Sequence, residues 1–235
     1  NSKFRSFDIY KDFGRVQKLK DLTKDTMISH IGIGHTRWAT HGKVTKDNAH
    51  PHYSQSKRFI IVHNGVIENH EELKAQYLKD SFFYSETDTE VIAQLIESFS
   101  QTLSVENAIL TTLKLLEGSY ALLVIDTQSP DTIYAAKNKS PLVLGQSEDG
   151  VTIASDIMAL VGYSDNYLAL SDHTFVVCEA DDVRLYNLNH EYIKPQFYDI
   201  ELDDVSTELG TFQHYMLKEI YEQPDVMKRV LEGRI

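Results

Sequence analysis

Cysteine, proline and long apolar runs are scarce in this sequence. Its 235 residues include one cysteine, Cys178, and five prolines. A single cysteine excludes an internal disulfide, and no apolar run approaches the length of a transmembrane helix. We therefore expect a chain of a reducing compartment, the cytoplasm, with no linker that divides it before about residue 200.

Basic residues are also in deficit. Lysine and arginine together number 23 against 35 acidic residues, which gives a formal net charge of −12. An acidic chain is a poor partner for the phosphate backbone of nucleic acids and for an anionic membrane surface. The acidic residues are scattered in short pairs, which is typical of a solvated surface. We expect no nucleic acid and no membrane among the partners.

The spacing of apolar residues predicts both helices and strands. The predicted helices cover 17–22, 70–78, 85–101, 104–118 and 214–235, and the predicted strands cover 7–10, 31–34, 57–63, 120–126, 132–138, 141–146, 150–155, 174–180 and 183–187. Asn69, with Glu72 three residues later, is the expected N-cap of the second helix. Strands, then helices, then many closely spaced strands indicate an α+β layered fold with antiparallel sheets.

Histidines are concentrated in one part of the chain, which raises the possibility of a metal centre. Six of the ten lie between residues 35 and 70: His35, His41, His50, His52, His63 and His70. No cysteine lies near them, no pair has the spacing of two ligands on one helix face, and an extended His50-Pro51-His52 would point its rings to opposite sides. We expect hydrogen-bonding histidines near a polar pocket, and no metal.

The stretch HTRWATHG, residues 35–42, follows the alternating Ile-Gly-Ile-Gly and crowds polar side chains into one loop. A loop with no binding task is usually built from Gly, Pro, Asn, Asp and Ser. Here Arg37 offers a planar fork suited to a carboxylate, and its neighbours can donate and accept hydrogen bonds. The composition favours a loop that binds a small polar ligand.

The stretch VHNGVIEN leaves two interpretations open. Asn-Gly between apolar residues is the strongest short signal for a β-hairpin turn. Alternatively, the Asn64 amide and the Gly65 backbone N–H could converge on a developing negative oxygen, as in an oxyanion hole. The residues by themselves favour neither.

The stretch SETDTE, residues 85–90, is also ambiguous. Ser85 and Thr87 with acids three residues later are typical of helix capping, and Asp88 suits the first turn of a helix. In a functional interpretation Asp88 binds an ammonium group. Combined, Arg37, Asp88 and Asn64-Gly65 match the carboxylate, the ammonium and the side-chain carbonyl of glutamine.

Five motifs carry a resemblance to a known family. HTRWATHG, NAHPH, VHNGVIEN, SETDTE and HYMLKEIYEQP occur in this order, and together they resemble the glutaminase domain of the glutamine–fructose-6-phosphate aminotransferase family, a class II amidotransferase. The resemblance covers about residues 14–235. It implies the N-terminal-nucleophile hydrolase fold, a four-layer αββα sandwich of antiparallel sheets.

The resemblance also implies roles for individual residues. Asn64 and Gly65 would form the oxyanion hole, and the glutamine would be bound by Arg37 at its carboxylate, by Asp88 at its ammonium group, and by the neighbouring Trp38, Thr40, His41 and His50. Trp38 is similar to the residue that gates the passage of ammonia towards the sugar domain. No metal or organic cofactor is implied.

The sequence departs from the family at its nucleophile. Members use a cysteine at the mature N-terminus, whose α-amino group acts as the base. This sequence begins with Asn1, and Cys178 lies in an apolar strand typical of a buried structural thiol. We expect residues 1–212 to be a glutaminase domain without its N-terminal strand and nucleophile, inactive as given. Residues 213–235 would be a helical connector towards an absent sugar-isomerase domain.

The predicted function is hydrolysis of glutamine through a γ-glutamyl thioester, which supplies ammonia for the synthesis of glucosamine 6-phosphate from fructose 6-phosphate. The full-length protein is expected to be a homodimer. Two alternatives remain. One is the glutaminase domain of another class II amidotransferase, such as the amidophosphoribosyltransferase of purine synthesis. The other is a non-catalytic glutamine-sensing module, which the missing cysteine would suit.

Overall fold

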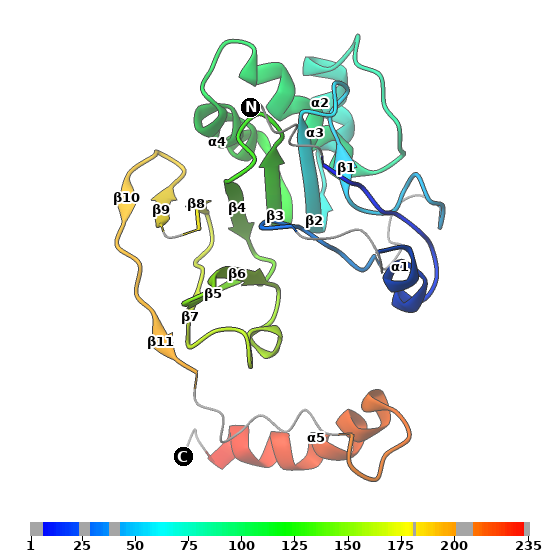
Figure 1. Ribbon diagram of the computed structural model, residues 1–235, viewed down its shortest axis with the longest axis vertical. Helices are drawn as coiled ribbons and strands as arrows, with labels where there is room; N and C mark the ends of the chain where they lie inside the picture. The colour runs from blue at the N-terminus through cyan, green and yellow to red at the C-terminus, as the bar shows by residue number, and fades with distance from the viewer. Residues whose placement is uncertain (1–6, 24–28, 38–42, 181, 201–208, 233–235) are drawn as a thin grey trace. The chain divides into compact units, whose positions relative to one another are not determined.

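The computed structural model describes residues 7–23, 29–37, 43–180, 182–200 and 209–232. The chain forms two compact units, residues 1–200 and residues 201–235, and Figure 1 labels their elements. Within these described ranges, no helix is both long and apolar enough to cross a lipid bilayer. The site described below lies in the first unit.

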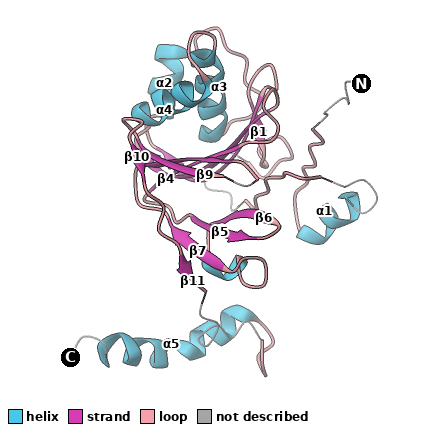
Figure 2. Ribbon diagram, turned by 60° about the vertical axis from the view of Figure 1, so that its left-hand side comes forward, coloured by secondary structure: helices cyan, strands magenta, loops and turns pink. Residues whose placement is uncertain are grey.

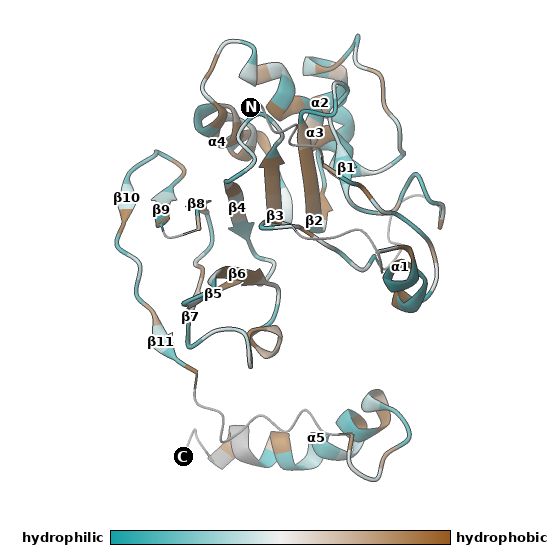
Figure 3. Cartoon of the chain, viewed as in Figure 1, coloured by the Kyte–Doolittle hydropathy of each residue, from teal (hydrophilic) through white to brown (hydrophobic). Residues whose placement is uncertain are grey.

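A seven-stranded sheet forms the centre of the first unit. Its strands are antiparallel throughout, in the order β1-β2-β3-β4-β8-β9-β10. Their bounds are β1 His52–Tyr53, β2 Phe59–Ile67, β3 Gly118–Asp126, β4 Ile133–Asn138, β8 Thr174–Cys178, β9 Val183–Asn187 and β10 Tyr192–Ile193. Figure 3 shows that β2, β3 and β4 are mostly hydrophobic along their lengths, as strands covered on both faces must be.

Three helices cover one face of this sheet: α2 His70–Tyr77, α3 Asp88–Ser100 and α4 Val105–Leu115. The apolar stripe predicted for α3 is buried, and Val91, Ile92 and Leu95 pack in one core with alternate residues of β2 and β3. Ser104 is the N-cap of α4, and its hydroxyl accepts the Asn107 N–H. The short helix α1, Val16–Thr23, agrees with the predicted helix at 17–22.

A second antiparallel sheet covers the opposite face, as Figure 2 shows. Its order is β11-β7-β5-β6, with the bounds β11 Tyr198–Asp199, β7 Asn166–Ala169, β5 Val143–Ser147 and β6 Gly150–Ala154. A second core, which includes Leu144, Leu168 and Val176, fills the space between the sheets. The next residue of β5, Gly145, approaches Leu160 and Ser164, just after the 3-10 turn η1, Ile157–Ala159.

The predicted fold class is therefore confirmed. Helices and two antiparallel sheets lie in layers, and each sheet contributes alternate residues to a core. The predicted helices and the closely spaced strands after Gly118 all occur, with boundaries shifted by a few residues.

Three local predictions were wrong. Residues 7–10 and 31–34 form no strand, because an alternating pattern predicts an extended chain but does not supply a neighbouring strand. The strand predicted to end at residue 63 continues to Ile67 as β2. Asn69 precedes α2, but its side chain makes no capping bond to the helix. Its Nδ2 donates to the Leu115 carbonyl and its Oδ1 accepts the Glu117 N–H, and these two bonds join α2 to the end of α4.

The described part of the second unit contains one helix, α5, Tyr215–Glu232. Helix was predicted on both sides of Pro224, and α5 runs through this proline. Large apolar side chains such as Met216, Ile220 and Met227 are exposed along it.

Candidate active site

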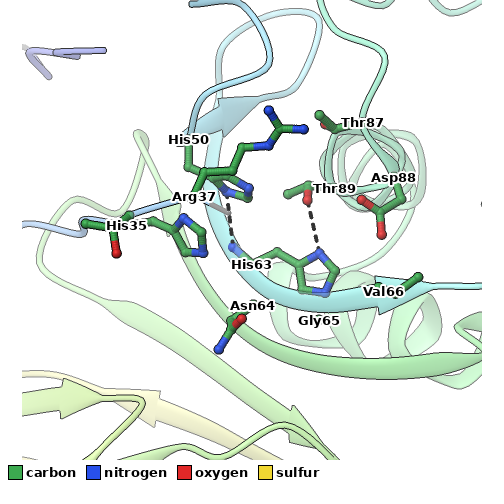
Figure 4. A pocket seen from close by; sticks show the side chains of 11 residues that line it. His35, Arg37, His50, His63, Asn64, Gly65, Val66, Thr87, Asp88 and Thr89 are labelled. Atoms are coloured by element: carbon green, nitrogen blue, oxygen red, sulfur yellow. Dashed lines mark hydrogen bonds between the residues drawn. The ribbon is translucent and has the colours of Figure 1, made fainter. Parts of the chain in front are cut away.

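A polar cavity of about 250 Å³ lies where β2 meets the first turn of α3 and residues 35–37 (Figure 4). It is lined by His35, Thr36, Arg37, His50, His63, Asn64, Gly65, Val66, Thr87, Asp88 and Thr89. The cavity thus brings together five of the eight site residues predicted from the sequence. The other three, Trp38, Thr40 and His41, lie outside the described residues.

Asn64 and Gly65 lie inside β2, paired with Ala121 and Tyr120 of β3. The hairpin interpretation of this Asn-Gly pair was therefore wrong, because the strand continues through it. Gly65 has φ of 141°, and a Cβ atom there would lie 2.1 Å from the Ser119 carbonyl oxygen. Only glycine fits this close approach of β2 to β3.

The Asn64 side chain is exposed at the edge of the cavity. In Figure 4 it points to the opposite side of β2 from His63, as the alternation of a strand requires. Arg37 lies across the cavity from Asn64, and its Nη1 donates to the Lys43 carbonyl at 3.2 Å. The cavity thus has a guanidinium on one side and an amide on the other.

Asp88 is the first residue of α3 and is 7% exposed. Its Oδ2 accepts the Ile67 N–H at 2.8 Å, which joins the helix to β2. Within the described chain, no hydrogen bond reaches its second oxygen. A carboxylate with one oxygen held by the backbone and the other facing a polar cavity can bind a cation.

The capping interpretation of SETDTE is correct in placing Asp88 in the first turn of a helix, but it is wrong about the capping hydroxyl. Thr87 precedes α3 but its side chain makes no capping bond to the described helix, and its hydroxyl lies 3.2 Å from Nε2 of His52. Glu90 instead accepts the backbone N–H groups of Tyr84 and Ser85, at 2.7 and 2.6 Å. These bonds hold the loop in place and leave Asp88 for other partners.

The histidines beside the cavity are packed against one another. The rings of His35 and His50 stack with centroids 4.1 Å apart, and those of His50 and His52 meet edge to face at 4.7 Å. Burial lowers the pKa of His35 to about 4 and that of His52 to about 3, and burial together with neighbouring His35 also lowers the pKa of His50. The cluster is therefore uncharged at neutral pH.

His35 and His63 line the cavity and were not assigned a role from the sequence. For His63, the signal is its position in β2, where Phe59, Ile61 and Ile67 at alternate positions face the helix-side core. Across the described ranges, no group of three or more His, Cys, Asp or Glu side chains is arranged to hold a metal ion.

Cys178 does not line the cavity. It lies in β8 and is 5% exposed, within the core between the two sheets. Burial raises the pKa of its thiol to about 12, so that it remains protonated at neutral pH. It is a structural thiol, as predicted.

Comparison with known proteins identifies the family. A family model described as a glutamine amidotransferase domain matches residues 20–190. The glutamine–fructose-6-phosphate aminotransferase (isomerizing) of Bacillus cereus is 48% identical over 225 residues, which cover 95% of this chain and 38% of the relative. The protein of the same name from Listeria innocua is also 48% identical, over 96% of this chain and 37% of the relative. The chain thus spans less than two-fifths of their length.

A solved structure is similar in fold. Glutamine phosphoribosylpyrophosphate amidotransferase from B. subtilis, complexed with ADP and GMP, is 26% identical, with a TM-score of 0.56 over 67% of this chain and 35% of that protein. The family match covers well over half of the chain and includes every described residue of the cavity. This chain belongs to the glutamine amidotransferase domain family.

Proposed function

We propose that this chain is the glutaminase domain of an enzyme that makes glucosamine 6-phosphate from fructose 6-phosphate and glutamine. The supporting observation is the cavity in which Arg37, Asp88 and Asn64-Gly65 meet. We choose fructose 6-phosphate as the acceptor of the ammonia because the chain is 48% identical to a glutamine–fructose-6-phosphate aminotransferase. Its identity to the phosphoribosylpyrophosphate amidotransferase is 26%.

The cavity is suited to an amino acid held at both ends. Arg37 binds the α-carboxylate as a planar fork, and Asp88 binds the α-ammonium group through the oxygen that the Ile67 N–H does not occupy. The amide end of glutamine then reaches Asn64 and Gly65. His50 lies beside Arg37 as an uncharged ring, which keeps a competing positive charge away from the ammonium group.

Hydrolysis requires a thiolate that attacks the amide carbon of glutamine. The carbonyl oxygen becomes an oxyanion, which the Asn64 amide and the Gly65 N–H stabilise by donating hydrogen bonds. The amide nitrogen takes up the proton that the thiol gave up and leaves as ammonia. Water then hydrolyses the γ-glutamyl thioester to glutamate and returns the free thiol. No metal or organic cofactor takes part. Trp38, Thr40 and His41 complete the site from the HTRWATHG loop.

We infer that Cys178 is not the attacking thiol, because it is buried and burial raises the pKa of its thiol to about 12; it is the one cysteine of the sequence. The remaining proposals concern the whole protein. Residues 213–235 form a helical connector to a sugar-isomerase domain, which uses the ammonia, and the full-length protein is a homodimer in the cytoplasm.

Calorimetry and an ammonia assay test the glutaminase proposal together. A polypeptide of these 235 residues should bind L-glutamine and release no ammonia above the rate in buffer, whereas a longer version with an N-terminal cysteine should release it. Arg37→Lys should weaken glutamine binding in both, since Lys cannot reproduce the fork. The proposal is overturned if glutamine does not bind, or if Arg37→Lys leaves its Kd unchanged.

If the ammonia acceptor is not fructose 6-phosphate, the proposal that the domain hydrolyses glutamine still holds. The longer version should form glucosamine 6-phosphate from fructose 6-phosphate and glutamine. Ammonia release without that product, but with transfer to phosphoribosylpyrophosphate, would identify the alternative amidotransferase. Binding without hydrolysis in every version would identify the glutamine sensor.

A further inference from the structure

His63 occupies a central position beneath the cavity. It lies in β2 two residues before Gly65 and is 3% exposed (Figure 4). Because the strand alternates, His63 and Gly65 both face the helices, on the same side as the buried Ile61 and Ile67. An imidazole in this apolar layer requires a reason, since burying a polar ring costs free energy unless its nitrogens are bonded.

Both ring nitrogens of His63 have partners. Nε2 lies 3.3 Å from the Ser119 carbonyl oxygen of β3, and Nδ1 lies 3.0 Å from Oγ1 of Thr89 in α3. A carbonyl oxygen can only accept, so Nε2 carries the hydrogen. In a neutral ring Nδ1 then accepts from the Thr89 hydroxyl. Burial lowers the pKa of His63, which favours this neutral form.

The Ser119 carbonyl is the group that approaches Gly65 most closely. An added Cβ at Gly65 would lie 2.1 Å from this oxygen and 3.0 Å from Nε2 of His63. The Ser119 hydroxyl also accepts the Val66 N–H at 3.3 Å. The conformation of the Asn64-Gly65 peptide therefore depends on where β3 presents Ser119, and the His63 ring holds that carbonyl.

The second partner of His63 lies beside Asp88. Thr89 is the next residue in the first turn of α3, and Asp88 itself accepts the Ile67 N–H. Two hydrogen bonds thus join this turn to β2, one from residue 63 and one from residue 67. They bracket Asn64-Gly65 along the strand.

We propose that His63 is a positioning residue for glutamine hydrolysis, whose neutral ring fixes the Gly65 N–H relative to the first turn of α3. The inference rests on the proposed function and extends it. In this role the His63 ring sets the distance between the part of the cavity that binds the oxyanion and the part that binds the ammonium group. His63 does not contact the reacting atoms in this role.

Two substitutions separate the two bonds of the ring. His63→Gln retains a donor near the position of Nε2, for the Ser119 carbonyl, whereas His63→Asn retains an acceptor near Nδ1, for Thr89. In a version of the protein with an N-terminal cysteine, His63→Asn should lower kcat about 10- to 100-fold with little change in KM. The kcat of the His63→Gln variant should be higher than that of His63→Asn. On a logarithmic scale, the difference should be at least a third of the loss that His63→Asn causes.

A matched pair of threonine variants controls for stability. Thr89→Val removes the partner of Nδ1, and Thr112→Val removes a buried hydroxyl that donates to the Ala108 carbonyl in α4. Thr89→Val should lower kcat, and Thr112→Val should not, at a similar loss of thermal stability. Equal kcat for the His63→Asn variant and the wild type, or losses of kcat that follow only the melting temperature, would overturn the inference.

Nitrogen-15 NMR of histidine tests the tautomer without any need for activity. In the 235-residue chain, Nε2 of His63 should be protonated and Nδ1 unprotonated from pH 6 to 8. Protonation at Nδ1 in this range would overturn the inference. If glutamine does not bind the wild-type chain while the tautomer of His63 is as expected, that result would overturn the proposed function. The assignment of the two hydrogen bonds of His63 would still stand.

Discussion

At the scale of single residues, the described lining of the cavity has one cation and one anion among uncharged histidine rings. Arg37 and Asp88 are the charged groups that line it, and His35 and His50 beside Arg37 have lowered pKa values. Burial is the main cause, and Arg37 itself contributes. Each of the two charged groups on the α-carbon of an amino acid then meets one complementary charge.

The role of Asp88 can be separated from its structural bond. Asp88→Asn keeps an oxygen that can accept the Ile67 N–H but removes the charge. If Asp88 binds the ammonium group, the affinity for glutamine should fall by about 2–5 kcal/mol. The midpoint of thermal unfolding should change little. Calorimetry with glutamine on the folded variant measures the effect, and an unchanged Kd would remove Asp88 from the site.

The buried histidines should make the protein sensitive to acid. The pKa of His52 is lowered to about 3, so between this value and about 6.5 the unfolded chain binds a proton that the folded chain does not. Stability is therefore present above pH 6.5 and is lost as the pH falls through this window.

His52→Gln removes this ionisation. The free energy of unfolding should then depend less on pH between 6 and 4, by up to about 1.4 kcal/mol per pH unit. Urea unfolding at a series of pH values measures the slope. His190→Gln, at an exposed site, is the control. A slope equal to that of the wild type would contradict a neutral His52.

At the scale of elements, the close contact of β2 with β3 determines the shape of the cavity floor. Nine residues of β2 pair in continuous register with β3, and Gly65 is opposite Tyr120. The Asn-Gly pair that predicts a turn is thus part of a strand. Its glycine serves the approach of Ser119 instead.

Gly65→Ala should be costly for two reasons, the φ of 141° and the clash with the Ser119 carbonyl. The expected loss in the free energy of unfolding is about 2–5 kcal/mol. Gly162→Ala is the matched control, since Gly162 also has a positive φ, of 81°, but no atom lies within 4 Å of an added Cβ. Denaturant unfolding compares them, and equal losses would mean that the close approach is unimportant.

At the scale of the whole molecule, the described residues that form the two cores all belong to the first unit. The residues that form them lie between Phe59 and Phe197, on the two sheets and the helices α2, α3 and α4. We expect residues 1–200 to fold alone. Removal of residues 201–235 should lower the melting temperature by less than about 4 °C and leave the Kd for glutamine unchanged. A truncated chain that does not unfold cooperatively would contradict this.

Several features of this protein could be predicted from the sequence because they depend on local patterns. The apolar stripe of α3 identifies the helix and its buried face, and the alternating strands after Gly118 identify the antiparallel sheets. The residue types of Arg37, Asp88 and Asn64-Gly65 predict a glutamine site, and the structure brings these residues to one cavity. The prediction is possible because charge and hydrogen-bonding capacity belong to the side chain itself.

Other features were decided only by the tertiary structure. The turn signal of Asn64-Gly65 was overridden by pairing with β3, and the extended residues 31–34 form no strand because none of the described strands pairs with them. Nothing in the sequence indicates that His63 bonds to Ser119, 56 positions away. Such contacts depend on which segments the fold brings together, and a local pattern cannot specify its distant partner.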